Sequence, residues 1–587
     1  MVIVMRKSFV WLGILCMALA LTVQSCEKSD GYERGNEAVT WRSIDKEQSV
    51  GASADNNFEF KFVARAAWTA ESDNPAMLTI RTAKSGDKGT HNMTIAISEN
   101  NTGVERTGRI MITVDGYEPE ELMAITQSDT DHPDYAANKK SDEYLSEYYL
   151  WNDEYNTLTR NLSQPYDEFV ENTLASMKTN GEDGGLYSDG SRYLYSFIER
   201  YPASSATRSV LTKTAEVSFG FISLTFLSFS NSNGAYGFAV DGVYPDSPAA
   251  RAGIVRGDII AEWNGANITA SNYVDVFYTL LMPSAGEKAS FKLNVKDAQT
   301  ITLSAESMYK NPVLHAEIVE RGDAKIGYLV YSDFEASFDD ELLIETGKFK
   351  AAGITDMVLD LRINGGGHVI SAQMMASIIA GEQGEGKDCL KYEYNPDRMR
   401  KKGYSKPDNM ETMKFGYNAA APGKMSRYSK SDYLSLSRVY VLVTGNTASA
   451  SELTFTALRG IDFPVTLIGE RTEGKNVGME PDIFVTGGYE YMFYPITFRY
   501  FNAKNETCDP EGTQPDYEVE DWNDGYSDWG SENDPMLAKA VALITGEEKT
   551  PETRAVEKGR RAVPVADSKL KYNPRRGGLV APVRESK

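Results

Sequence analysis

The chain has 587 residues, of which 41% are hydrophobic, and its formal net charge at pH 7 is −23. This length predicts three or four domains, and the hydrophobic content supplies real cores, which excludes a disordered protein. The negative charge argues against nucleic acid or anionic lipid as the main partner. The four histidines show no metal-ligand spacing, so we expect neither a metal site nor another cofactor.

The N-terminus resembles a bacterial lipoprotein signal. Two basic residues precede an apolar run at 9–23, which is short for a membrane span and is followed by a cysteine, Cys26. The resemblance implies removal of residues 1–25, lipidation of Cys26 and a tether at 26–35. We therefore expect a cell-envelope lipoprotein in the outer membrane, facing either the periplasm or the outside.

After that processing two cysteines remain, Cys389 and Cys508. They could pair in an oxidising compartment, or they could be two unpaired thiols. The sequence leaves both readings open because it does not show their separation.

Residues 36–130 alternate apolar and polar side chains in short runs separated by turns, which predicts an immunoglobulin-like β-sandwich. Trp68 and the closing AITQSD segment resemble a BACON domain, which implies carbohydrate binding. We place no aromatic platform there and favour a spacer, so carbohydrate binding by this segment stays open.

Residues 131–211 are helical and aromatic, and Tyr144, Leu145, Tyr148 and Tyr149 at helical spacing predict a core rather than a ligand site.

Residues 212–308 resemble a PDZ domain, an α+β fold, most clearly in the run SPAARAGIVRGDII. The resemblance implies that a peptide adds as a strand while loop N–H groups capture its carboxylate. The loop would be formed by Phe219, Gly220, Phe221 and Ile222. Alternatively, the domain packs against the next domain and gates it.

The α/β stretch 309–548 is organised around the segment 439–475. An apolar strand pattern leads into a helical pattern at Ser449, and a second strand pattern precedes Lys475. A serine at a helix N-terminus is a candidate nucleophile because unpaired N–H groups there hold negative charge. A lysine whose pKa burial lowers can act as its base. Alternatively, Ser449 and Glu452 form only a capping box.

Two motifs in this stretch resemble the C-terminal-processing (tail-specific) serine peptidases: TASASELTFTAL followed by GERTEGK, and DLRINGGG. The first implies a Ser449/Lys475 dyad in a crotonase-like core. The second implies an oxyanion hole formed by the N–H of Gly366, or alternatively Gly367, together with that of Ala450. The expected function is a serine endopeptidase that cleaves polypeptides after PDZ-assisted recognition of extended or C-terminal segments.

Some residues depart from the pattern of that family. Ile363 replaces a frequent asparagine, Met479 replaces a glutamine that orients the lysine, and Glu470 and Glu473 would raise the lysine's pKa if close to it. Outside the motifs, we expect the insert 382–437 to be a lid or a surface elaboration, and the basic tail 549–587 to be disordered.

Two further alternatives remain open. His368, which follows the glycine turn, could serve a Ser–His arrangement. The chain could also be a non-catalytic peptide- or glycan-binding surface lipoprotein on a protease fold.

Overall fold

The computed structural model describes residues 38–44, 46–100, 105–128, 134–186, 192–203, 213–229, 236–293, 300–406, 409–417, 428–522, 525–547 and 562–564. The expected signal, lipidation site and tether, and most of the basic tail, lie outside the described residues. The chain divides into two compact units, with the boundary near Thr126. Within the described part, no helix is both long and apolar enough to cross a membrane.

The first unit contains two β-sheets, with strand orders β1-β3-β7-β5 and β2-β9-β8-β4-β6. The strands are β1 (Val39–Arg42), β2 (Glu47–Val50), β3 (Asp55–Ala64), β4 (Trp68–Ser72), β5 (Leu78–Ile80), β6 (Ser85–Gly86), β7 (Gly89–Ile97), β8 (Arg106–Val114) and β9 (Glu120–Gln127). Phe62 of one sheet packs edge to face on Trp68 of the other, with ring centroids 4.9 Å apart. Trp68 is therefore a core residue, while the immunoglobulin-like and BACON-like assignment stays a prediction.

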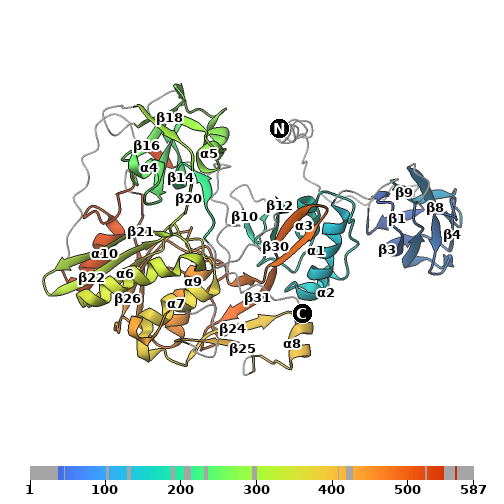
Figure 1. The fold of residues 1–587 in the computed structure, drawn as a ribbon. Coiled ribbons are helices and arrows are strands. Elements are labelled where there is room, and N and C mark those ends of the chain that lie inside the picture. The colour runs from blue at the N-terminus through green and yellow to red at the C-terminus, as the bar shows by residue number, and fades with distance from the viewer. Residues whose placement is uncertain are drawn as a thin grey trace, which may run out of the picture. The chain divides into compact units, whose positions relative to one another are not determined.

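The second unit begins with the expected helical segment: α1 (Tyr135–Tyr148), α2 (Asn152–Tyr155) and α3 (Tyr166–Ala175). Short strands follow: β10 (Gly185–Leu186), β11 (Arg192–Tyr193) and β12 (Phe197–Pro202). Leu145 and Tyr149 are fully buried in a core that also includes Phe493 of a much later strand. Leu145 and Tyr149 are thus core residues, as predicted, whereas Tyr144 and Tyr148 are only partly buried. The helical segment packs against the later strands of the α/β region (Figure 1).

The PDZ segment forms a sheet of order β19-β18-β16-β15-β14-β33, with β17 beside β16 and a separate pair of β13 and β20. Its elements are β13 (Glu216–Ser218), β14 (Phe221–Phe229), β15 (Tyr236–Val243), α4 (Pro248–Arg251), β16 (Ile259–Trp263), β17 (Ala266–Asn267), α5 (Tyr273–Leu281), β18 (Lys288–Leu293), β19 (Thr300–Ser304), β20 (Glu306–Met308) and, from the C-terminal tail, β33 (Ala562–Pro564). Helix α5 packs on β14 through Tyr273, whose ring stacks on that of Phe226.

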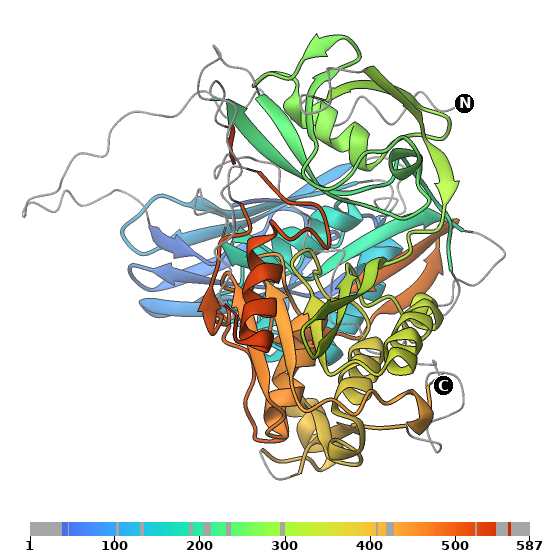
Figure 2. The ribbon, with the colours of Figure 1, turned by 90° about the vertical axis from the view of Figure 1, so that its left-hand side faces the viewer.

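The α/β region is built on a sheet of order β21-β22-β23-β26-β27-β32, parallel from β22 onward. Its strands are β21 (Val313–Arg321), β22 (Ala324–Tyr331), β23 (Asp356–Asp360), β26 (Val439–Val443), β27 (Val465–Gly469) and β32 (Tyr517–Glu518). Helices α6 (Asp339–Ala352), α7 (Val369–Ala380) and α9 (Ala450–Gly460) share a core with one face, and α10 (Pro535–Thr545) covers the other (Figures 1 and 2).

Two smaller sheets complete the region, with orders β25-β24-β31-β28 and β12-β30-β29. Their elements are β24 (Asp388–Tyr394), α8 (Pro396–Lys402), β25 (Glu411–Lys414), β28 (Val477–Met479), β29 (Asp482–Thr486), β30 (Tyr489–Tyr494) and β31 (Ile496–Phe501). The insert 382–437 therefore contributes a central strand to one of these sheets, because β24 pairs with β25 on one side and with β31 on the other. Cys389 and Cys508 are buried free thiols, so the structure contains no disulfide between them.

A buried ionic cluster connects the expected PDZ segment to the α/β region. Arg362, fully buried, pairs with Asp360, with Asp521 at 2.8 Å and with Asp534 at 2.7 Å. Arg256 of the PDZ domain pairs with the same Asp521 at 2.5 Å. Removing one partner of such a cluster would leave an uncompensated buried charge. Because Arg362 lies just before the glycine turn, its ion pairs hold the backbone at the start of that turn.

Candidate active site

The segments that carry Gly366, Ser449 and Lys475 meet at one edge of the parallel sheet. Gly366 follows β23, Ser449 follows β26 and Lys475 follows β27, and these three strands are neighbours. Ligand and catalytic sites of open α/β sheets form at the carboxyl ends of the strands. The fold therefore brings together residues that are far apart in the sequence.

Ser449 occupies a strained position at the start of α9. Its φ of 62° and ψ of −111° lie in a region that costs a non-glycine residue about 1–3 kcal/mol. A sharp strand-to-helix turn of this kind exposes a nucleophile in other hydrolases. Here the side chain is fully buried, and Oγ makes no hydrogen bond among the described residues.

The glycine turn lies directly against Ser449. A Cβ added to Gly366, whose φ is 115°, would stand 2.8 Å from the Ser449 Cβ, so only glycine fits there. The Gly366 N–H donates to Asn364 Oδ1 at 2.9 Å, and the Asn364 carbonyl accepts from the Ala448 N–H at 3.2 Å. Asn364 therefore joins the glycine turn to the serine turn.

Lys475 is also buried, at 1% exposed, and its amine has no hydrogen-bond partner among the described residues. Burial lowers the pKa of Lys475 to about 8, although the carboxylates of Asp183, Glu473 and Glu452 oppose that shift. The ammonium lies over the ring of Tyr195, 4.3 Å from its centroid. Because neither Oγ nor Nζ is paired, the Ser449–Lys475 hydrogen bond is not formed in this structure.

Glu452 holds the two candidate residues at fixed positions. Its Oε2 accepts from the backbone N–H groups of Ser449 at 2.9 Å and Lys475 at 2.8 Å. Its Oε1 accepts from the Thr472 hydroxyl at 2.6 Å and the Gly474 N–H at 2.9 Å. The sequence predicted this glutamate as part of a capping box with Ser449, and the structure forms that box through the Ser449 N–H. The glutamate also connects the nucleophile turn to the lysine segment.

Glu470 and Glu473, which would raise the pKa of Lys475 if they paired with it, have other hydrogen-bond partners. Glu473 accepts from the hydroxyls of Tyr195, at 2.9 Å, and Tyr193. Glu470 accepts from the Asp521 N–H at 3.1 Å. Lys475 therefore has no ion pair with either one, although Glu473 still raises its pKa through space. Met479 is fully buried in the core shared with the helical segment, so it packs and cannot orient the lysine by hydrogen bonding.

Of the predicted oxyanion-hole residues, Ala450 follows Ser449 directly and Gly366 lies against it, whereas Gly367 lies against Phe334 and Asp333. The N–H groups of Gly367 and Ala450 have no hydrogen-bond partner among the described residues, whereas that of Gly366 is taken by Asn364. The Ala450 N atom lies 3.0 Å from where a Gly366 Cβ would be. Gly367 and Ala450 therefore have N–H groups that no described residue uses.

The alternative base, His368, is directed elsewhere. Its Nδ1 lies 3.2 Å from the Ala336 N–H and 3.1 Å from the Phe334 carbonyl oxygen. It makes no hydrogen bond to Ser449.

Ile363, which stands where the peptidase motif often has asparagine, packs with Trp529 against Gly242 of the PDZ domain.

The PDZ loop residues lie where β14 begins. Phe219 and Phe221 are buried in the PDZ core, and Ile222 reaches Gly242. Gly220 has a φ of 102°, and a Cβ there would stand 2.2 Å from Ser247 Oγ. The loop thus requires glycine at this position.

The segment 131–211 contributes residues to the site that the sequence did not predict. Asp183 accepts from the Tyr149 hydroxyl at 2.7 Å and from the Ser196 hydroxyl at 2.6 Å, and it is the carboxylate that most opposes the low pKa of Lys475. Tyr195 covers the lysine. No local pattern marks these residues, because only the shared core brings them to the site.

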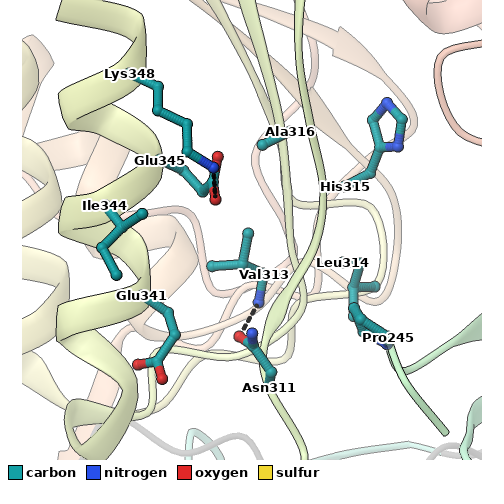
Figure 3. Close-up of a pocket in the computed structure, with 10 residues that line it drawn as sticks. All are labelled: Pro245, Asn311, Val313, Leu314, His315, Ala316, Glu341, Ile344, Glu345 and Lys348. Atoms are coloured by element: carbon teal, nitrogen blue, oxygen red, sulfur yellow. Dashed lines mark hydrogen bonds and ion pairs between the residues drawn. The ribbon is translucent and has the colours of Figure 1, made fainter.

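A separate cleft of about 310 Å³ opens between β21, α6 and Pro245 (Figure 3). On its helical wall Lys348 pairs with Glu345 at 2.7 Å. Neither Ser449 nor Lys475 lines it. Within the described residues, no group of three His, Cys, Asp or Glu side chains is placed to hold a metal ion.

Comparisons with known proteins agree with this geometry. Residues 325–519 match the model of peptidase family S41, and residues 240–289 match that of the PDZ domain. The chain is 26% identical over 262 residues to the chloroplastic carboxyl-terminal-processing peptidase 1 of Arabidopsis thaliana, covering 44% of this chain and 47% of that protein. It is 27% identical over 276 residues to the carboxy-terminal processing protease CtpA of Bacillus subtilis, covering 47% and 51%. The chain thus spans about half the length of these curated relatives.

A putative S41 protease of known structure from Bacteroides fragilis has the same fold. The TM-score is 0.53 at 23% sequence identity, over 70% of this chain and 97% of that chain. The chain therefore carries a peptidase family S41 domain together with a PDZ domain, and its relatives include C-terminal-processing proteases.

Proposed function

We propose that the chain is a serine endopeptidase in which Ser449 is the nucleophile and Lys475 the general base. One observation carries this proposal: two buried, unpaired polar atoms, Ser449 Oγ and Lys475 Nζ, belong to residues held together by a single carboxylate, Glu452. Buried polar atoms are normally hydrogen-bonded, and strained backbone clusters at functional sites, so the unpaired Oγ of Ser449 at its strained turn is typical of a reactive group.

The chemistry follows from these positions. Neutral Lys475 takes the hydroxyl proton as Ser449 Oγ attacks the peptide carbonyl, and it then protonates the leaving amine. The N–H groups of Gly367 and Ala450 hold the developing oxyanion, and water then releases the acyl group from the serine. With a pKa of about 8, about a tenth of Lys475 is neutral at pH 7, far more than an ordinary lysine provides.

The neighbouring parts of the chain extend this proposal. The PDZ domain presents substrate segments by adding them to the edge of β14, with their C-terminal ends toward Phe219, Gly220, Phe221 and Ile222. A lipid on Cys26 anchors the protein to the outer membrane. The test is incorporation of labelled palmitate, which should be lost in Cys26→Ser. The β-sandwich serves as a spacer, unless its deletion abolishes binding to polysaccharide.

The first test is degradation of an unfolded model protein by the lipid-free chain from residue 27. The comparison includes Ser449→Ala, Lys475→Ala and, as a control, Ser437→Ala, which changes an exposed serine of the same domain. We expect cleavage by the parent and the control, and none by the two site variants. Activity that survives Ser449→Ala would contradict the mechanism.

If the parent itself does not cleave, a serine-reactive fluorophosphonate probe tests whether Ser449 is a reactive nucleophile. Labelling of the parent but not of Ser449→Ala supports a competent nucleophile that lacks a suitable substrate. Absence of labelling in both would favour a non-catalytic binding protein on a protease fold.

A further inference from the structure

The C-terminal tail returns to the PDZ domain. β33 (Ala562–Pro564) pairs antiparallel with the end of β14, in the register Leu227↔Pro564, Ser228↔Val563 and Phe229↔Ala562. It forms the last strand of the PDZ sheet and appears as a short red strand beside the green ones (Figure 2). The expected disordered tail thus contains one ordered contact within the described residues.

The edge that β33 occupies is the one a PDZ ligand uses. The other edge of β14 pairs with β15, and α5 packs on β14 through Tyr273 and Phe226. PDZ ligands add as a strand to a free sheet edge, with the carboxyl end toward the carboxylate-binding loop. The antiparallel register directs β33 along β14 toward Phe221, where the loop Phe219–Ile222 lies. β33 therefore has the polarity of a ligand.

We propose that the tail segment around Ala562–Pro564 is an intramolecular ligand of the PDZ groove, which a substrate segment must displace. The inference rests on the assignment of the β14 edge as the peptide-binding edge in the proposed function. It adds that the end of this edge, at Leu227–Phe229, is occupied before any substrate arrives. The fully buried Ser449 belongs to the same tail-bound structure.

A weak contact is enough for such competition. A ligand tethered to its own binding site has an effective concentration on the order of 1 mM. If the free tail peptide binds with a Kd of about 0.1 mM, the tethered tail weakens the binding of any competitor about tenfold. The short apolar sequence AVPVA suits this role because strand addition depends on backbone hydrogen bonds, and an edge strand tolerates a proline.

The experiment uses the chain from residue 27 to 587 with Ser449→Ala, so that nothing is cleaved. The probe is a fluorescent peptide of residues 556–570, and its binding is followed by anisotropy. The test variant combines Ala562→Pro with Val563→Pro. Neighbouring residues of a strand direct their N–H groups to opposite edges, so one of the two prolines removes a donor that faces β14. A matched control places the same two prolines at Val580 and Ala581.

We expect the test variant to bind the probe about tenfold more tightly than the native chain and the control variant. Hydrogen exchange in residues 221–229 should be faster in the test variant when no peptide is present. Equal binding and equal exchange in all three chains, or no binding to any of them, would overturn the proposal. An unrelated peptide with a free carboxyl end tests the PDZ assignment separately, because its failure to bind the test variant would refute the groove rather than the tail.

Discussion

Replacing Lys475 by methionine should abolish activity and yet stabilise the fold at pH 7. Burial lowers the lysine pKa from 10.5 to about 8, so holding the ammonium in the native state costs about 3 kcal/mol. Methionine has a similar length and no charge. It loses the contact with the Tyr195 ring, which is worth about 0.5–2 kcal/mol. The net gain at pH 7 should therefore be about 1–3 kcal/mol.

The gain must depend on pH in a defined direction. The unfolded chain keeps this proton up to about pH 10.5, whereas the folded chain releases it near pH 8. Between these values the unfolded state binds more protons, so the parent becomes more stable as the pH rises. The difference in the free energy of unfolding between Lys475→Met and the parent should have its largest value below pH 8 and should decrease toward pH 10.5.

Urea unfolding at pH 7 and pH 10 measures both effects, because titrations shared by the two chains cancel in the difference. Lys348→Met is the matched control, since it removes a lysine that is 62% exposed and should change stability by no more than about 0.5 kcal/mol. If Lys475→Met is less stable than the parent by the same amount at both pH values, the lysine is stabilised as a cation by its neighbours. The assignment as a base would then be refuted.

Three further outcomes follow from the same contacts. The kcat/KM should rise with pH to a midpoint near 8, and Glu473→Gln should move that midpoint lower, because this carboxylate raises the lysine's pKa. Glu452→Gln should lower kcat/KM about 10- to 100-fold with an unchanged fold by circular dichroism, because one oxygen that serves two donors is lost. Gly366→Ala should lower kcat at least about 100-fold, since its Cβ would stand 2.8 Å from that of Ser449, whereas Gly445→Ala, with only a 3.9 Å contact, should not.

The local patterns that marked the site depend on short stretches of sequence. The strand before Ser449, the helix after it, the glycine turn and the strand before Lys475 all lie where the sequence predicts them. Their meeting at one edge was predictable because parallel strands align their carboxyl ends. The burial of Leu145 and Tyr149 also followed from helical spacing.

The sequence by itself thus determined the PDZ and S41 segments through their motifs, and the strand-to-helix turn that carries Ser449 through the pattern of neighbouring residues. Only the tertiary structure decided what surrounds Lys475. The Tyr195 ring, the alternative partners of Glu473 and the four contacts of Glu452 join segments from distant parts of the chain. The return of the tail to β14 was hidden for the same reason, since strand addition depends on backbone hydrogen bonds and leaves no pattern in the side chains.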